Sequence, residues 1–243
     1  MKPYYDDGRG HVIYHGDARE IVPALEPLFG RPDVVLTDPP YGDRTHAGAR
    51  TSKGNKVAQY GGPTRKLVTF ESTTADELRD VFAACRPLRW LVSFIEWQHA
   101  LPLEQDPPAG LEFVRLGVWV KPNGAPQFSG DRPATGWEAV ALLHARPGRM
   151  KWNGGGMPAV WTCNKEEGEH PTQKPEALVR ELVGLFSDPG EYILDPFAGA
   201  GTSLVAAKAL GRAAVGCELE ERYCEIAARR LEQEILQFEE PAP

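Results

Sequence analysis

The sequence predicts an α/β fold built on a doubly wound, mostly parallel sheet in a single domain with long loops. Short apolar runs alternate along the chain with segments of helical periodicity, the order that places helices on both faces of a parallel sheet. With 243 residues, the chain suits one large α/β domain, so we expect residues 1–243 to form a single unit. Its 25 glycines and 22 prolines are high counts, and they indicate long loops.

The apolar runs and the periodic segments locate the expected elements. Strands are expected at residues 12–15, 34–37, 89–95, 116–120, 138–144, 192–194 and 213–217. Helices are expected at residues 18–28, from a Thr74 cap through 82, from 174 to about 186, through 206 to 210, and through 223–231. Residues 42–72 show no clear period, so we expect a long loop there.

Composition limits the class of protein. No apolar run reaches the length of a membrane span, and Met1-Lys2-Pro3-Tyr4 begins no signal-peptide pattern, so we expect a cytoplasmic protein. The four cysteines form no C-x-x-C pair and have no zinc-like histidine spacing, so no metal is expected.

The tetrapeptide Asp38-Pro-Pro-Tyr41 follows the apolar strand at 34–37, at the strand end where open α/β sheets place ligands. Pro39 and Pro40 fix the backbone and push the preceding residues out of the helical region. Their carbonyls remain good acceptors for an external amino group. A carboxylate, a free carbonyl and an aromatic ring suit a planar substrate bearing an –NH2 group. A plain strand-ending turn with a capping Asp is the alternative interpretation.

Charge is unevenly distributed around this tetrapeptide. The net charge of −7 argues weakly against a nucleic-acid partner, yet residues 42–66 carry six basic side chains and one acid, Asp43. Loops at 42–72 and 121–137 are therefore candidates for DNA contact, and solvated loops are the alternative. The basic candidates are Arg44, Arg50, Lys53, Lys56, Arg65, Lys66, Arg132, Arg149 and Lys151.

A glycine turn in the second half predicts a pocket for a nucleoside-bearing cofactor. Gly199 and Gly201 lie between an expected strand and an expected helix, where backbone can approach a ligand at the helix N-terminus. Glu218 stands roughly 20 residues further, at the end of the next strand, the separation from which a carboxylate accepts ribose hydroxyls. The turn lacks a third glycine and a P-loop lysine, so a cofactor with a ribose and no phosphate fits better than NAD or ATP.

Three motifs in one order resemble a known family. Asp38-Pro-Pro-Tyr41, His170-Pro-Thr-Gln-Lys-Pro175 and Asp195-Pro-Phe-Ala-Gly-Ala-Gly-Thr202 resemble the beta-class amino-methyltransferases of DNA that use S-adenosylmethionine, over residues 11–232. The resemblance implies a Rossmann-like class I methyltransferase fold in circularly permuted order. It also implies S-adenosylmethionine as the cofactor and S-adenosylhomocysteine as the product. Members of this family often insert a target-recognition domain between the first two motifs, and only loops and strands are visible here.

The resemblance assigns roles to individual residues. Asp38, Pro39, Pro40 and Tyr41 would form the catalytic motif. The cofactor would be bound by Asp17, Ala18, Thr172, Gln173, Lys174, Asp195, Phe197, Gly199, Gly201, Thr202 and Glu218. DNA is the expected partner, a base is flipped into the site, and Tyr41 stacks on it.

The target atom and the partners stay open at this point. Asp at the first position of the catalytic motif favours the N6 amino group of adenine, because cytosine-N4 enzymes of the family more often have Ser there. Cytosine N4 is the alternative. An RNA amino-methyltransferase is disfavoured by the motif order, and a non-catalytic relative by the intact motifs. A homodimer, a cognate restriction endonuclease and a bacterial or phage host are compatible with the sequence.

Overall fold

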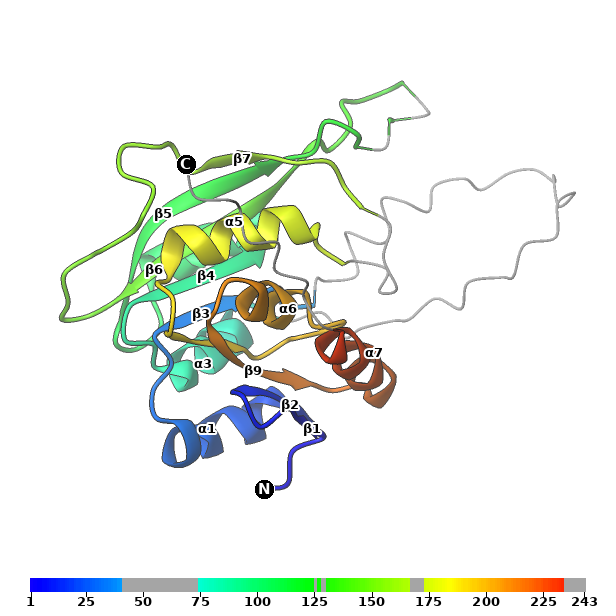
Figure 1. Cartoon of the computed structure of the whole chain (residues 1–243). Coiled ribbons are helices and arrows are strands. Elements are labelled where there is room, and N and C mark those ends of the chain that lie inside the picture. The colour runs from blue at the N-terminus through cyan, green and yellow to red at the C-terminus, as the bar shows by residue number, and fades with distance from the viewer. Residues whose placement is uncertain (41–73, 125, 128–129, 167–172, 234–243) are drawn as a thin grey trace, which may run out of the picture.

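The structure is a computed structural model. It describes residues 1–40, 74–124, 126–127, 130–166 and 173–233. These residues contain a nine-stranded sheet in the order β1-β2-β9-β8-β3-β4-β6-β5-β7 (Figure 1). The strands are β1 (Tyr5–Asp6), β2 (His11–His15), β3 (Val34–Thr37), β4 (Trp90–Ile95), β5 (Leu111–Val120), β6 (Trp137–Ala145), β7 (Val160–Thr162), β8 (Tyr192–Asp195) and β9 (Ala213–Glu218). The helices are α1 (Ala18–Phe29), α3 (Ala75–Cys85), η1 (Trp97–His99), α4 (Ala100–Gln105), α5 (Glu176–Phe186), α6 (Thr202–Ala209) and α7 (Glu221–Glu232).

The sheet is mostly parallel, as the alternation of strands and helices predicted. Parallel pairing joins β2 to β9, β9 to β8, β8 to β3, β3 to β4 and β5 to β7. Antiparallel pairing joins β1 to β2 and places β6 between β4 and β5. The expected doubly wound α/β fold is therefore confirmed.

The direction of winding reverses between two neighbouring strands, β8 and β3. From β8 the chain passes through α6 to β9 on one side, and from β3 through α3 to β4 on the other. The carboxyl ends of β8 and β3 therefore flank a topological switch point, the place where open α/β sheets bind ligands.

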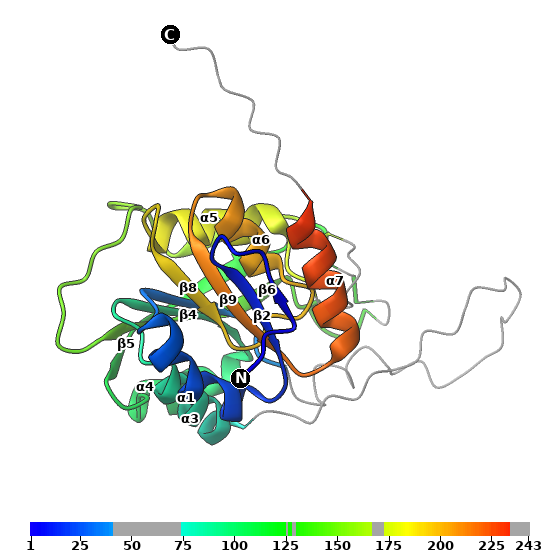
Figure 2. The ribbon, with the colours of Figure 1, turned by 60° about the horizontal axis from the view of Figure 1, so that its bottom comes forward.

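Helices cover both faces of the sheet (Figure 2). On one face, α5, α6 and α7 pack into a core whose buried residues include Leu182, Leu204 and Ala227. On the other face, α1, α3 and α4 bury Leu25, Phe82 and other apolar side chains. The apolar run of β3 is buried throughout because it is covered from both sides, as is typical of parallel strands.

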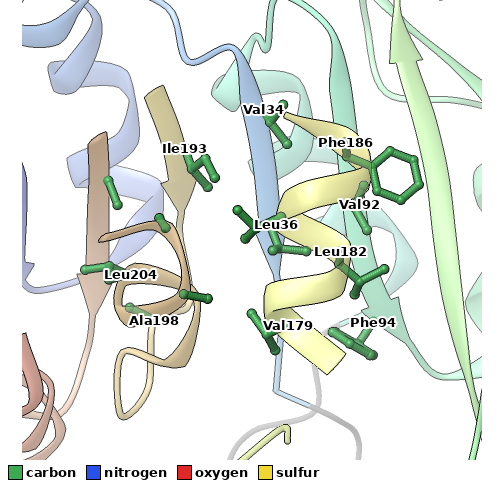
Figure 3. Packing of buried hydrophobic residues seen from close by; sticks show 14 of the residues in the cluster. Val34, Leu36, Val92, Phe94, Val179, Leu182, Phe186, Ile193, Ala198 and Leu204 are labelled. Carbon is green, nitrogen blue, oxygen red and sulfur yellow. The ribbon is translucent and has the colours of Figure 1, made fainter. Parts of the chain in front are cut away.

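One contact fixes the switch point in particular. Val179, Leu182 and Phe186 of α5 lie over β3 and β4, where they meet Leu36 and Val92 (Figure 3). Full burial of each such side chain stabilises the fold by about 1.5–3 kcal/mol. Because only Pro175 separates Lys174 from α5, this packing also sets where Lys174 stands relative to the end of β3.

The structure extends or corrects the expected elements in several places. Strand β5 begins at Leu111, five residues before the expected start, because a bulge between Phe113 and Arg115 interrupts the apolar alternation. Helix α5 begins at Glu176 and not at Lys174, since the residue before a proline avoids the helical region. The short elements β1, η1, α4 and β7 were not expected. Thr74 caps α3 in a capping box with Glu77, as expected. Among the described residues, no helix has the length and apolar character needed to cross a membrane.

Candidate functional site at the carboxyl edge of the sheet

Asp195 ends β8 and is almost fully buried, at 4% exposure. Thr37 at the end of β3 donates its hydroxyl to Asp195 Oδ1 at 2.6 Å, and the Phe197 backbone N–H donates to the same oxygen at 3.0 Å. The Ser203 hydroxyl donates to the second oxygen. The carboxylate of Asp195 therefore ties together the two strands at the switch point and the first turn of α6.

This carboxylate is costly to ionise where it stands. Burial raises the pKa of Asp195 to about 6, and the negative charge of Asp38 adds to the rise, while the three hydrogen bonds act in the opposite direction. A cationic partner next to Asp195 would stabilise the ionised carboxylate and offset the cost of its burial. A perturbed carboxyl group at a sheet edge is a candidate for ligand binding.

Asp38 follows β3 directly, beside a buried Pro39. The ammonium group of Lys174, which is 6% exposed, donates to Asp38 Oδ2 at 2.5 Å. The first and second motifs of the sequence therefore meet in space, although 136 residues separate these two side chains. Tyr41 lies outside the described residues.

Glu218 closes β9 next to the glycine turn. Its Oε2 accepts a hydrogen bond from the Gly199 N–H at 2.8 Å, and its Oε1 accepts one from the Glu220 N–H at 2.8 Å. Burial raises the pKa of the Glu218 carboxyl group despite these bonds. The predicted association of Gly199 with Glu218 is present, and each carboxylate oxygen keeps further lone pairs for a hydroxyl.

Gly201 makes a close contact between two helices, in addition to the cofactor contact that the glycine motif predicts. Its φ is 75°, and a Cβ there would lie 2.7 Å from the Cβ of Ala227 in α7. The missing side chain therefore lets α6 and α7 approach each other. The neighbouring Thr202 is 7% exposed, and its hydroxyl accepts from Arg230 of α7 at 3.0 Å.

We expect Gly201→Ala to destabilise the fold by about 2–4 kcal/mol, from overpacking together with left-handed backbone strain. Gly211→Ala is the matched control, because Gly211 has a φ of 73° and open space around its Cβ position. This control should cost only about 1 kcal/mol. Urea unfolding of both variants measures the difference, and equal losses would show that the contact with Ala227 is unimportant.

Asp17 and Ala18 stand at the carboxyl end of β2, two strands from Asp195 in the sheet. Asp17 caps α1 by accepting from the Arg19 N–H at 2.8 Å, and its carboxylate also pairs with the Arg19 guanidinium at 2.5 Å. These bonds from Arg19 lower the pKa of Asp17 against the opposing effect of burial. Gly16 donates its N–H to the Glu218 carbonyl at 2.9 Å, which joins this segment to the acid of the next strand.

The expected DNA-contacting residues divide into three groups. The basic residues between 42 and 72 lie outside the described residues, as does Thr172, which was expected to bind the cofactor. Arg132 is exposed on the loop between β5 and β6, at the same edge as Asp38. Arg149 and Lys151 lie at the opposite edge: the carbonyl of Lys151 accepts from Trp90 Nε1 at 2.6 Å, and its ammonium group pairs with Asp188 at 2.5 Å. These two DNA-contact candidates therefore flank the amino ends of the strands, at the edge opposite Asp38.

The sequence did not predict a role for Glu138, whose carboxylate is a second charge partner of Lys174. Glu138 lies in β6, its Oε2 is 3.3 Å from Lys174 Nζ, and its Oε1 accepts from Lys121. An acid at the amino end of an apolar strand resembles an ordinary solvated residue. Only the antiparallel insertion of β6 beside β4 reveals that it faces the site.

The arrangement defines a doubly wound enzyme with an acidic turn and a cofactor-type glycine turn at one switch point. A family profile described as DNA methylase matches residues 145–229. Type II methyltransferase M2.DpnII of Streptococcus pneumoniae is 30% identical over 257 residues, covering 96% of this chain and 93% of that protein. Type II methyltransferase M.HpaI of Haemophilus parainfluenzae is 42% identical over 235 residues, covering 85% of this chain and 70% of that protein. The crystal structure of the M1.HpyAVI–SAM complex aligns with a TM-score of 0.67 at 23% identity, covering 90% of this chain and 98% of that one.

The chain belongs to the S-adenosylmethionine-dependent DNA methyltransferases. The resemblance that the three motifs indicated is thus confirmed by the match over nearly the whole chain. The class I methyltransferase fold is confirmed as well.

Proposed function

We propose that this enzyme transfers a methyl group from S-adenosylmethionine to the N6 amino group of an adenine that is flipped out of duplex DNA. The observation that carries the proposal is the position of Asp38 at the end of β3, next to Asp195 at the end of β8. Two acids from two motifs thereby flank one switch point, where a methyl donor and an acceptor can meet.

The cofactor residues are proposed from the geometry around Asp195. Its buried carboxylate suits the α-ammonium group of S-adenosylmethionine, together with Phe197 and the turn from Gly199 to Thr202. Gln173 fits the same group, because its Oε1 is buried and has no hydrogen-bond partner among the described residues. Glu218 would hold the ribose hydroxyls, and Asp17 and Ala18 would border the adenine. The bound cofactor supplies an electrophilic methyl group.

The chain's own groups prepare the acceptor nitrogen. The lone pair of an exocyclic amine is conjugated into the ring, so the amine is a poor nucleophile. Hydrogen bonds from the amine to the Asp38 carboxylate and to the Pro39 carbonyl would let the nitrogen pyramidalise. Asp38 then stabilises positive charge as it develops on nitrogen, and it need not deprotonate the neutral amine. Alignment of the two reactants adds up to roughly 7–11 kcal/mol in favourable systems.

The DNA surface is proposed to lie along this same edge. Two exposed tryptophans stand there: Trp97 begins η1 just after β4, and Trp137 begins β6, the strand next to β4. Exposed aromatic rings can stack on bases, and stacking is worth about 1–3 kcal/mol per base. Arg132 and the basic residues between 42 and 72 are the proposed phosphate contacts, with Tyr41 stacking on the flipped base.

We also propose one domain over residues 1–243 and a cytoplasmic location. Because the relatives are type II methyltransferases, we propose a cognate endonuclease as a functional partner. A homodimer is compatible with this arrangement.

The nature of the modified base is tested directly. The protein is incubated with duplex DNA and methyl-labelled S-adenosylmethionine, and the DNA is then hydrolysed to nucleosides. We expect the label in N6-methyldeoxyadenosine. Label in N4-methyldeoxycytidine would replace adenine with cytosine as the target, and no labelled DNA would contradict the proposed function.

A further inference from the structure

Four charged side chains form a connected network beside the proposed catalytic carboxylate. Lys174 Nζ lies 2.5 Å from Asp38 Oδ2 and 3.3 Å from Glu138 Oε2, and Lys121 pairs with the other oxygen of Glu138. The four residues come from four places in the chain: after β3, after β5, in β6 and before α5. All four side chains are at most 24% exposed.

Lys174 remains an ammonium ion in this position. Burial acts to lower its pKa, but the carboxylates of Asp38 and Glu138 outweigh burial, and the pKa of Lys174 lies above its ordinary value. The pKa of Glu138 is below its ordinary value, since Lys174 and Lys121 overcome its burial. Lys174 is therefore not a base in the reaction, and it also stands 4.9 Å from the ring centre of Phe94.

A fixed ammonium ion on Asp38 conflicts with the chemistry proposed above. The amino group of the target must donate to the same carboxylate, and its nitrogen becomes positive as the methyl group arrives. A second cation held against Asp38 would compete for its oxygen and would repel the developing charge. Lys174 needs another carboxylate to which it can turn.

Resting on the proposed function, we infer that Glu138 is a positioning residue that shares Lys174 with Asp38 and draws it away when the target amine binds. Glu138 Oε2 is already 3.3 Å from the ammonium group, so a small movement exchanges one ion pair for the other. Lys121 holds Glu138 in place from its other oxygen and stands 4.6 Å from the ring centre of Trp119. Lys174 stays paired throughout, which a buried ion requires.

The test compares opposite charge changes at Lys174 and at its second carboxylate partner, Glu138. In Glu138→Gln, Lys174 loses the charge of its second carboxylate and stays on Asp38. The acid limb of kcat/KM for DNA should therefore move to lower pH by about half a unit or more, and kcat should fall about tenfold. In Lys174→Met, the same limb should move to higher pH, because the Lys174 charge next to Asp38 is removed. The measurements use saturating S-adenosylmethionine, which covers Asp195, a further acid whose charge interacts with that of Asp38.

Glu191→Gln is the matched control. Glu191 pairs with Arg89 at the opposite edge of the sheet and is 20% exposed, against 21% for Glu138. This variant should alter the melting temperature but not the acid limb. Glu138→Asp should keep part of the kcat that Glu138→Gln loses, because it retains the carboxylate. Circular dichroism checks that each variant is folded.

Two results would overturn the inference. One is an acid limb that moves in the same direction, or not at all, in Glu138→Gln and Lys174→Met. The other is a loss of kcat in Glu138→Gln that is matched by Glu191→Gln. Wild-type protein that labels no DNA would defeat the proposed function itself. Active wild type with unchanged variant profiles would defeat only the role of Glu138.

Discussion

Replacing Asp38 with asparagine should lower kcat by roughly 10²–10³-fold, the usual effect of removing one preorganised electrostatic group. The substitution keeps the shape of the side chain and an oxygen that Lys174 can reach, so only the negative charge is lost. That charge is what we propose stabilises the nitrogen as it becomes positive. Affinity for S-adenosylmethionine should change by less than about threefold, because Asp195, Gly199 and Glu218 are untouched.

Asp33 provides the matched control for this prediction. It stands directly before β3, as Asp38 stands directly after it, and its Oδ2 accepts from the Tyr192 N–H at 2.8 Å. Asp33→Asn keeps that acceptor and lies at the opposite edge of the sheet, so kcat should be unchanged. Single-turnover transfer of labelled methyl groups measures both variants. A tenfold or smaller loss in Asp38→Asn, or an equal loss in Asp33→Asn, would contradict the proposed role of Asp38.

The central strands β3, β8 and β9 were predictable because each is a largely buried apolar run that ends in a polar residue. The runs before Asp38, Asp195 and Glu218 identify their strands without knowledge of their neighbours. The spatial meeting of Asp38 and Asp195 also follows from the fold class, since strand ends converge at a switch point.

Other features depended on packing that no local pattern records. The glycine motif predicted a ligand near Gly201, but it carried no sign that Ala227 of α7 approaches this glycine closely as well. Lys151 looked like a DNA contact because of its charge and its glycine-rich loop, and only the pairing of that loop with Trp90 and Asp188 places it at the far edge. Glu138 gave no signal at all, because its role depends on the antiparallel insertion of β6 beside β4.

Replacing Asp195 with asparagine should stabilise the cofactor-free protein at neutral pH while it removes cofactor binding. The pKa of Asp195 is raised by burial to about 6 from an ordinary value of 3.8, so its ionised form at pH 8 costs roughly 3 kcal/mol of folding stability. An amide keeps the acceptor for Thr37 and for the Phe197 N–H, and the Ser203 hydroxyl can rotate to accept from the new amide hydrogen. The melting temperature should rise by about 2–4 °C for each kcal/mol recovered.

The pH dependence of this gain has a defined sign. The stability that Asp195 gains from its proton is fully present below about pH 3.8 and is lost as the pH rises through about 6. The stability that Asp195→Asn gains over wild type should therefore be full at pH 8 and roughly half as large at pH 5.

Thermal unfolding at both pH values, with and without S-adenosylmethionine, measures the stability gain and the loss of cofactor binding together. Wild type should melt higher with the cofactor, whereas the variant should not, since its amide offers no charge to the cationic ligand. A variant that is less stable than wild type at pH 8 would show that the hydrogen bonds of the carboxylate outweigh its burial, and a retained cofactor shift would remove Asp195 from the proposed binding site.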